Sequence, residues 1–403
     1  MFDCTNYENC PKNKSFLEVK KYKLKENFNF FFTGCWGVYC RDGEHYTYKY
    51  KKNDDGGSKL KIEEEIYGQS SVANCMEKFS KENNVDLVIL GGDNVYSDKL
   101  DEVSKLIIEE ISYDYKYILY DIEKQLRDGF SKCFSNIQTK EYLIAIGNHD
   151  IENCDIINKQ FNYPTEEQKA RLNINDVKKD AMLELYREFQ NDKEYNVPEI
   201  QEKENKMKDT AEKWNLPALS YNKIYKMNDF FVNIICIDTN MYETKKGKAK
   251  WCEGTYPEDA IYKQKEWVER VLSKNKDVWN IVVGHIPAYC NHHKGEQPII
   301  NEHLFELLKE NKDYIHLYLC ADEHDQQYII SENLPPQIIS GSGGTPLDDP
   351  KCEQLVRETK FCEKQFGFVD LKCYKEKIIF NFINSFPENR KLCKLSDQFI
   401  IVR

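Results

Sequence analysis

The stretch VDLVILGGDNVY, residues 85–96, decides the fold class. Its first six residues are apolar apart from Asp86 and rich in Val, Leu and Ile, which is typical of a strand buried on both faces. The chain then turns at two glycines and presents Asp93, Asn94 and Tyr96. Because open α/β sheets place their sites at the C-terminal ends of such strands, the pattern predicts a layered α/β protein with a polar site there.

Six further apolar runs of strand length repeat this pattern along the chain. Continuous rather than alternating hydrophobicity indicates that they are also covered on both faces. They are Phe28–Phe32, Tyr142–Ile146, Phe231–Ile237, Trp279–Val283, Ile315–Cys320 and Gln337–Ile339. Helical patterns lie between them at Ser71–Asn84, Glu258–Asn275 and His303–Asn311, and two more strands, Gly367–Tyr374 and Lys377–Ile383, are expected near the end of the sequence.

Composition narrows the range of partners. The 403 residues carry 57 Lys+Arg against 68 Asp+Glu, a net charge of −11, with no basic block. This argues against nucleic acid or an anionic membrane as the main partner. No apolar run approaches the roughly 18 residues of a membrane span. The first residues lack the basic and apolar regions of a signal peptide, so the sequence as written predicts a cytoplasmic protein, or a trimmed mature form from the secretory pathway.

Three segments look like additions to the predicted sheets. Residues 41–68 are charged and rich in Gly and Asp, which predicts a loop. Residues 101–134 suggest amphipathic helices, and residues 165–213 suggest a solvated charged helical insertion through which a protein partner would bind. We therefore expect an N-terminal extension, residues 1–26, and one domain, residues 27–403.

Polar clusters follow five of the predicted strands, where side chains from different strands should meet. Their carboxylate, amide, phenol and imidazole groups are the mixture of oxygen and nitrogen donors that binds metal ions. The clusters are Gly34-Cys35-Trp36-Gly37, Gly91-Gly92-Asp93-Asn94-Val95-Tyr96, Gly147-Asn148-His149-Asp150, Gly284-His285 and Ala321-Asp322-Glu323-His324. An aspartate between two ions can bridge them, and a two-metal site suits in-line attack on phosphorus.

In this order the blocks resemble the calcineurin-like metallophosphoesterase superfamily, and within it the purple acid phosphatase branch. That branch reads GDxG, GDNxY, GNH[DE], GH and GHxH, and the second, third and fourth blocks match here. Tyr96, three residues after Asp93, is the feature specific to the branch. The resemblance implies a four-layer α/β/β/α sandwich with two mixed sheets, and a binuclear metal centre.

The resemblance also implies roles for individual residues. Asp93 would bridge the two metals, with Tyr96 and His324 on the first ion and Asn148 and His285 on the second. The first ion is ferric iron in this branch, the second a divalent iron, zinc or manganese, with magnesium also considered. Catalytic roles fall to His149, which would donate a hydrogen bond to the phosphoryl group, and to His292 or His293 near the leaving group.

Two blocks depart from the family pattern. Cys35 stands where the first block has its Asp, and Asp322 stands where the last block has its first His. Thiolate binds iron or zinc, and carboxylate binds manganese, magnesium, zinc or iron, so both substitutes can be ligands. For Cys35 a disulfide, for instance with Cys40, or an inert buried thiol stays open.

The resemblance therefore implies a phosphatase that hydrolyses phosphate monoesters by attack of a metal-bound hydroxide. Its substrate would be a phosphorylated small molecule or a phosphoprotein. The two departures support a second hypothesis, a catalytically impaired pseudophosphatase that serves as a binding or scaffold protein. A phosphodiesterase or protein phosphatase of the wider superfamily is a third.

Overall fold

The computed structural model describes the residues that form the sheets, their covering helices and the loops at the strand ends. They are residues 16–21, 25–37, 40–41, 44–45, 47–52, 58–63, 68–94, 129–130, 133–151, 209, 213–242, 244–245, 248–249, 259–274, 278–291, 302–350, 352 and 359–403.

One mixed sheet, here called sheet A, contains eight strands in the order β1-β10-β11-β14-β15-β17-β16-β18. Strands β11, β14, β15 and β17 run parallel to one another. Strand β10 is antiparallel to β11, and β16 is antiparallel to both β17 and β18. The bounds are β1 Phe16–Lys21, β10 Tyr221–Lys226, β11 Phe231–Cys236, β14 Trp279–Val283, β15 Leu317–Cys320, β16 Gln326–Ile329, β17 Gln337–Ser340 and β18 Thr359–Glu363.

A second mixed sheet, sheet B, contains seven strands in the order β21-β20-β19-β2-β7-β8-β9. Strands β2, β7, β8 and β9 are parallel, while β19, β20 and β21 form an antiparallel extension. The bounds are β2 Phe28–Thr33, β7 Leu87–Leu90, β8 Tyr142–Ile144, β9 Trp214–Asn215, β19 Gly367–Cys373, β20 Lys377–Ser385 and β21 Cys393–Val402.

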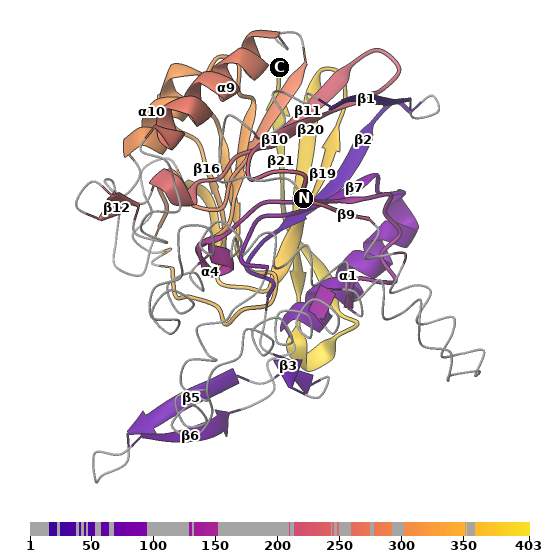
Figure 1. Ribbon diagram of the computed structural model, residues 1–403. Helices are drawn as coiled ribbons and strands as arrows, with labels where there is room; N and C mark the ends of the chain where they lie inside the picture. Colours follow the sequence, from indigo (N-terminus) through magenta and orange to yellow (C-terminus); the bar gives the residue numbers. More distant parts are fainter. Residues whose placement is uncertain are drawn as a thin grey trace, which may run out of the picture.

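Helices cover the outer faces of both sheets (Figure 1). Helix α1, Gly68–Asn83, packs on sheet B, and helices α9, Ala260–Lys274, and α10, Glu302–Glu310, pack on sheet A. Strand β2 shows why the apolar runs are continuous: Phe30 belongs to the core between the sheets, and Phe31 to the core under α1. Three apolar cores therefore separate four layers, which confirms the predicted α/β/β/α sandwich.

Several short elements lie outside the two large sheets. A four-residue helix α4, Asn148–Ile151, follows β8. Within the described residues the 3₁₀ helices η2 and η4 occupy Asn240–Tyr242 and Pro387–Asn389. Three two-stranded sheets are formed by β3 (Cys40–Arg41) with β4 (Glu44–His45), β5 (Thr47–Lys52) with β6 (Ser58–Glu63), and β12 (Thr244–Lys245) with β13 (Lys248–Ala249).

The prediction of a loop over residues 41–68 is wrong, because this stretch contains strands β4 to β6. Tyr48 and Tyr50 alternate with lysines in β5, and Leu60 and Ile62 do so in β6. Alternation around a Gly/Asp-rich turn is a hairpin signal, which the overall polarity of the segment obscured.

The predicted domain bounds stay predictions. Strand β1 lies within the expected extension, residues 1–26, and pairs parallel with β10 at the edge of sheet A. Two insertions were expected, residues 101–134 and 165–213. Residues 101–128 of the first and 165–208 of the second lie outside the described residues, so the expected partner surface on these insertions stays a prediction. Among the described residues, no helix has the length and hydropathy to cross a membrane.

Candidate metal centre

Chemistry-bearing residues gather where parallel strands of both sheets end. In sheet B, β2 leads to Cys35, β7 to Asp93, and β8 to Asn148 and His149 at the start of α4. In sheet A, β14 leads to His285, and β15 to Asp322 and His324. These seven residues were predicted from the sequence to form one site. The structure brings six of them into two groups that share Asp93, and His149 lies beside that shared carboxylate.

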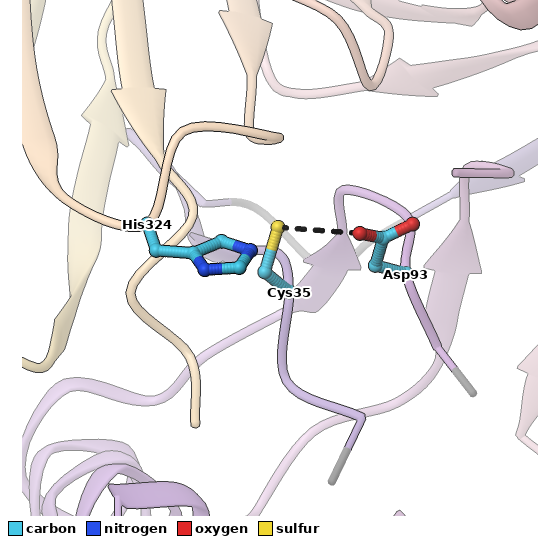
Figure 2. A group of neighbouring side chains, drawn as sticks. All are labelled: Cys35, Asp93 and His324. Carbon is cyan, nitrogen blue, oxygen red and sulfur yellow. Dashed lines mark hydrogen bonds between the residues drawn. The ribbon is translucent and has the colours of Figure 1, made fainter. Parts of the chain in front are cut away.

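The first group joins Cys35, Asp93 and His324. Their ligand atoms all lie within 4.8 Å of one another, and Figure 2 shows Cys35 between the other two side chains. The thiol donates toward Asp93 Oδ2 at 3.9 Å. His324 Nδ1 donates to the carbonyl of Pro346 at 3.0 Å, so a neutral imidazole keeps its lone pair on Nε2. This is a sulfur, oxygen and nitrogen donor set of the kind that holds zinc or iron.

The second group converges on Nε2 of the fully buried His285. Its Nδ1 donates to the carbonyl of Gly91 at 2.8 Å, so Nε2 carries the lone pair when the ring is neutral. Nε2 faces Asn148 Oδ1 at 3.1 Å, Asp93 Oδ1 at 3.2 Å and Asp322 Oδ1 at 3.4 Å. A lone pair surrounded by three acceptor oxygens requires a cation, either a proton or a metal ion. The chemistry of this set therefore fits a metal.

The charges of the two groups are coupled. Burial lowers the pKa of His285, but the charge of Asp93 and hydrogen bonds to Asp322 and Asp93 outweigh it and hold that pKa well above its usual range. For Asp93, burial raises the pKa, and the charges of His285 and His149 lower it below the usual range. Without metal the pair is an imidazolium and a carboxylate, and a bound ion would take the place of the imidazolium proton.

Three of the candidate ligands hold strained backbone. Cys35, Asp93 and Asp322 have φ of 49°, 53° and 64°, in the left-handed region that costs a non-glycine residue about 1–2 kcal/mol. The amide of Glu323 donates to the carbonyl of Ala321 at 2.7 Å, so Asp322 is the central residue of a γ-turn. Such strain persists where surrounding contacts enforce it, and it concentrates at functional sites.

Asp150 fixes the two loops that carry Asp93 and Asn148. Its buried carboxylate accepts hydrogen bonds from the amide of Asn94 at 3.0 Å, from Asn94 Nδ2 at 2.8 Å and from the amide of Gly147 at 2.8 Å. Gly147 in turn leaves room for Asp93, because a Cβ there would lie 2.1 Å from Asp93 Oδ1. The amide of His149 then donates to Asp93 Oδ1 at 3.1 Å, which places His149 beside the shared carboxylate.

Sequence reasoning missed the supporting roles of Asp150 and Thr239. Thr239 Oγ1 accepts hydrogen bonds from the amides of His285 and Ile286, at 3.1 and 3.0 Å, and so anchors the loop of the second group. The signal was present, since Asp150 completes the third block and Thr239 lies in an Asp-Thr-Asn segment that resembles the family. Their roles depend on contacts with backbone amides of other loops, about 50 residues away in sequence.

Three predicted site residues, Tyr96, His292 and His293, lie outside the described residues and stay predictions. Cys35 is described, and it is a buried thiol that takes no part in a disulfide. The alternative prediction that Cys35 forms a disulfide is therefore wrong. Cys35 stays a candidate metal ligand because it lies beside Asp93 and His324.

Curated relatives are acid phosphatases. Tartrate-resistant acid phosphatase type 5 from Sus scrofa is 27% identical over 152 residues, which cover 36% of this chain and 43% of that enzyme. Purple acid phosphatase 17 from Arabidopsis thaliana is 33% identical over 78 residues, 19% of this chain and 22% of that protein. These matches span less than half of each relative's length.

Solved structures share the fold at low identity. GAP50, described as the anchor in the inner membrane complex of Plasmodium, superposes with a TM-score of 0.56 at 15% identity, covering 94% of this chain and 89% of its own. PhoD superposes with a TM-score of 0.52 at 13% identity, covering 94% and 70%.

The model of one protein family matches residues 28–326, which run from the first strand of sheet B to the start of β16 and span every described candidate ligand. The chain belongs to the calcineurin-like phosphoesterase family, with distant similarity to the tartrate-resistant and purple acid phosphatases.

Proposed function

We propose that the protein is a binuclear metal-dependent phosphatase that hydrolyses phosphate monoesters. The observation that carries this proposal is the pair of donor groups joined by Asp93, one around His285 Nε2 and one containing Cys35 and His324. When bound, two ions would supply a nucleophile from water at neutral pH and neutralise charge on the phosphoryl group. Iron, zinc, manganese and magnesium are the candidates.

The chain's own residues would position and stabilise the substrate. Asp93 would hold both ions, with Cys35 and His324 on one side and Asn148, His285 and Asp322 on the other. His149, whose charge is felt by the Asp93 carboxyl, would donate a hydrogen bond to the phosphoryl oxygens as negative charge develops. His292 or His293, which follow the segment of His285 in the sequence, would protonate the leaving group.

The test is metal analysis paired with a phosphatase assay on the full chain. After loading with iron, zinc, manganese or magnesium, the protein should retain close to two ions and hydrolyse p-nitrophenyl phosphate. Asp93→Asn should lose activity by at least about 100-fold, as expected when the ligand shared by both ions is weakened. Asp370→Asn removes a carboxylate that is also buried, on β19 in the other part of sheet B, and is the matched control.

The same assay separates the phosphatase from its alternatives. The replacement of the expected Asp by Cys35 and of the expected His by Asp322 favours, as a second candidate, a pseudophosphatase that binds a partner. Absence of hydrolysis with all four metals would contradict the phosphatase proposal and support this second one. Faster hydrolysis of bis-p-nitrophenyl phosphate than of the monoester would instead indicate a phosphodiesterase.

A further inference from the structure

The thiol of Cys35 is held in place by contacts on both sides of its backbone. Its amide donates to the carbonyl of Gly92 at 2.9 Å, and its carbonyl accepts from the amide and the hydroxyl of Thr345 at 3.0 and 2.7 Å. By contrast, the buried thiols of Cys236, Cys320 and Cys373 lie on strands, among the apolar side chains of the cores. Cys35 thus differs from these structural thiols in where its sulfur points, toward Asp93 and His324.

The group around His285 has a different donor chemistry. It offers three oxygens, from Asp93, Asn148 and Asp322, to one imidazole nitrogen. Two of these oxygens belong to carboxylates, and the group contains no sulfur. Because Nε2 of the fully buried His285 faces only acceptors, this group independently requires a cation.

We infer that the two subsites select different classes of metal: the Cys35 subsite takes a sulfur-binding ion such as Zn²⁺, and the Asp322 subsite takes an oxygen-binding ion such as Mn²⁺. Soft thiolate selects zinc over manganese, and carboxylate and carbonyl oxygens suit manganese and magnesium. Binding at the first subsite displaces the thiol proton, so the thiolate is the ligand. This inference rests on the proposed metal centre and assigns a class of metal ion to each of its two subsites.

Cobalt substitution tests the first subsite directly, since a thiolate bound to Co²⁺ gives a near-ultraviolet charge-transfer band. The metal-stripped full chain should develop this band with its first equivalent of Co²⁺. The band should disappear in Cys35→Ser and in Cys35→Asp, which restores the family's carboxylate. Cys373→Ala, which removes a buried thiol from β19, is the control and should keep the band.

Manganese binding tests the second subsite. The electron paramagnetic resonance signal of free Mn²⁺ decreases as the ion binds to the protein. After one equivalent of Zn²⁺ has been added, this signal should show that the protein still binds one Mn²⁺. Asp322→Asn should weaken Mn²⁺ binding by about 10- to 100-fold or more, since even outer-shell changes have effects of that size. Zn²⁺ affinity should stay within about twofold. Asp349→Asn changes an exposed carboxylate on the loop after β17 and should alter neither affinity.

Each outcome decides between the inference and the proposed function. A cobalt band that persists without Cys35, displacement of Mn²⁺ by one equivalent of Zn²⁺, or unchanged Mn²⁺ affinity in Asp322→Asn overturns the inference, even if hydrolysis is intact. The predicted selectivity without hydrolysis upholds the inference and overturns the proposed function. Failure to bind Co²⁺, Zn²⁺ and Mn²⁺ overturns both.

Discussion

Cys35 Sγ lies 3.9 Å from Asp93 Oδ2, and both residues hold left-handed backbone on loops that are hydrogen-bonded to each other. The amide of Cys35 donates to the carbonyl of Gly92, and the amide of Gly37 donates to the carbonyl of Asp93, at 2.9 and 3.1 Å. The two strained residues therefore fix each other's positions. Their side chains are presented to one point, which is the preorganisation that a ligand pair needs.

Glycine should relieve the strain at position 35. Cys35→Ala and Cys35→Gly both remove the thiol, but only glycine adopts φ of 49° without strain. We expect Cys35→Gly to be more stable than Cys35→Ala by about 1 kcal/mol in urea unfolding of the metal-stripped protein. At Cys373, on a regular strand, the same pair of changes should show the opposite order. If Cys35→Gly is less stable than Cys35→Ala, the backbone at position 35 is not strained.

Asp150 should raise the affinity for metal ions although it is not a ligand itself. Asp150→Asn keeps the shape but replaces one acceptor oxygen by a donor. At the Oδ2 position this donor faces the amide of Gly147 and Nδ2 of Asn94, and at the Oδ1 position it faces the backbone amide of Asn94. We expect metal affinity to fall by about 10- to 100-fold in calorimetric titrations. Asp259→Asn, which alters an exposed carboxylate before α9, should leave affinity unchanged. Equal affinities for both variants would show that Asp150 does not position the ligand loops.

His316 should make the protein less stable in mild acid. Burial and then the charge of Arg403 lower its pKa from 6.5 to about 4, and its Nδ1 accepts the amide of Asn280. Because the unfolded chain then binds the proton more readily, stability is fully present above about pH 6.5 and declines as pH falls toward 4, by up to about 3 kcal/mol.

His316→Asn should flatten that decline when the free energy of unfolding is measured at several pH values between 4 and 7. His303→Asn on α10 changes an exposed imidazole and is the control. A His316→Asn variant with the same slope as the parent protein would rule out this histidine as a source of acid sensitivity.

The two disulfides among the described residues should contribute unequally to stability. Cys75–Cys393 joins α1 to β21 across 318 residues, whereas Cys352–Cys362 spans 10. A cross-link restricts the unfolded chain more when the loop is longer, so we expect double alanine variants to lose about 5–6 and about 2–3 kcal/mol respectively. Thermal and urea unfolding of both variants measure the difference, and equal losses would contradict the loop-length argument.

The sequence predicted most of the strands that are buried on both faces, because a continuous apolar run reveals that environment. Strand β16 is buried throughout but was not predicted, since it begins with two glutamines. Strand β10, which mixes polar with apolar residues, and the exposed edge strand β21 were not predicted, since their pattern depends on which neighbours cover them. The sheet order was also beyond sequence reasoning. In sheet B, β2 pairs with β7 on one side and with β19 on the other. Strand β19 begins more than 330 residues after the end of β2.

At the candidate site, motif order identified which residues meet, but not how they are held. Block matches placed Asp93, Asn148 and His285, while the left-handed backbone of Cys35 and Asp322 had no sequence signal, since neither is glycine. The three oxygens around His285 Nε2 also come from three separate loops. Their convergence is a property of the assembled sheets.

Donors for each proposed ion come from both sheets, with Asp93 and Cys35 from sheet B and His285 and His324 from sheet A. Metal ions held in this way would cross-link the two sheets of the sandwich in addition to taking part in hydrolysis. Unfolding would have to release them, so the free energy of unfolding should grow with the logarithm of metal concentration. Cells that starve of metal would then risk losing the protein itself, through unfolding and degradation, along with its activity.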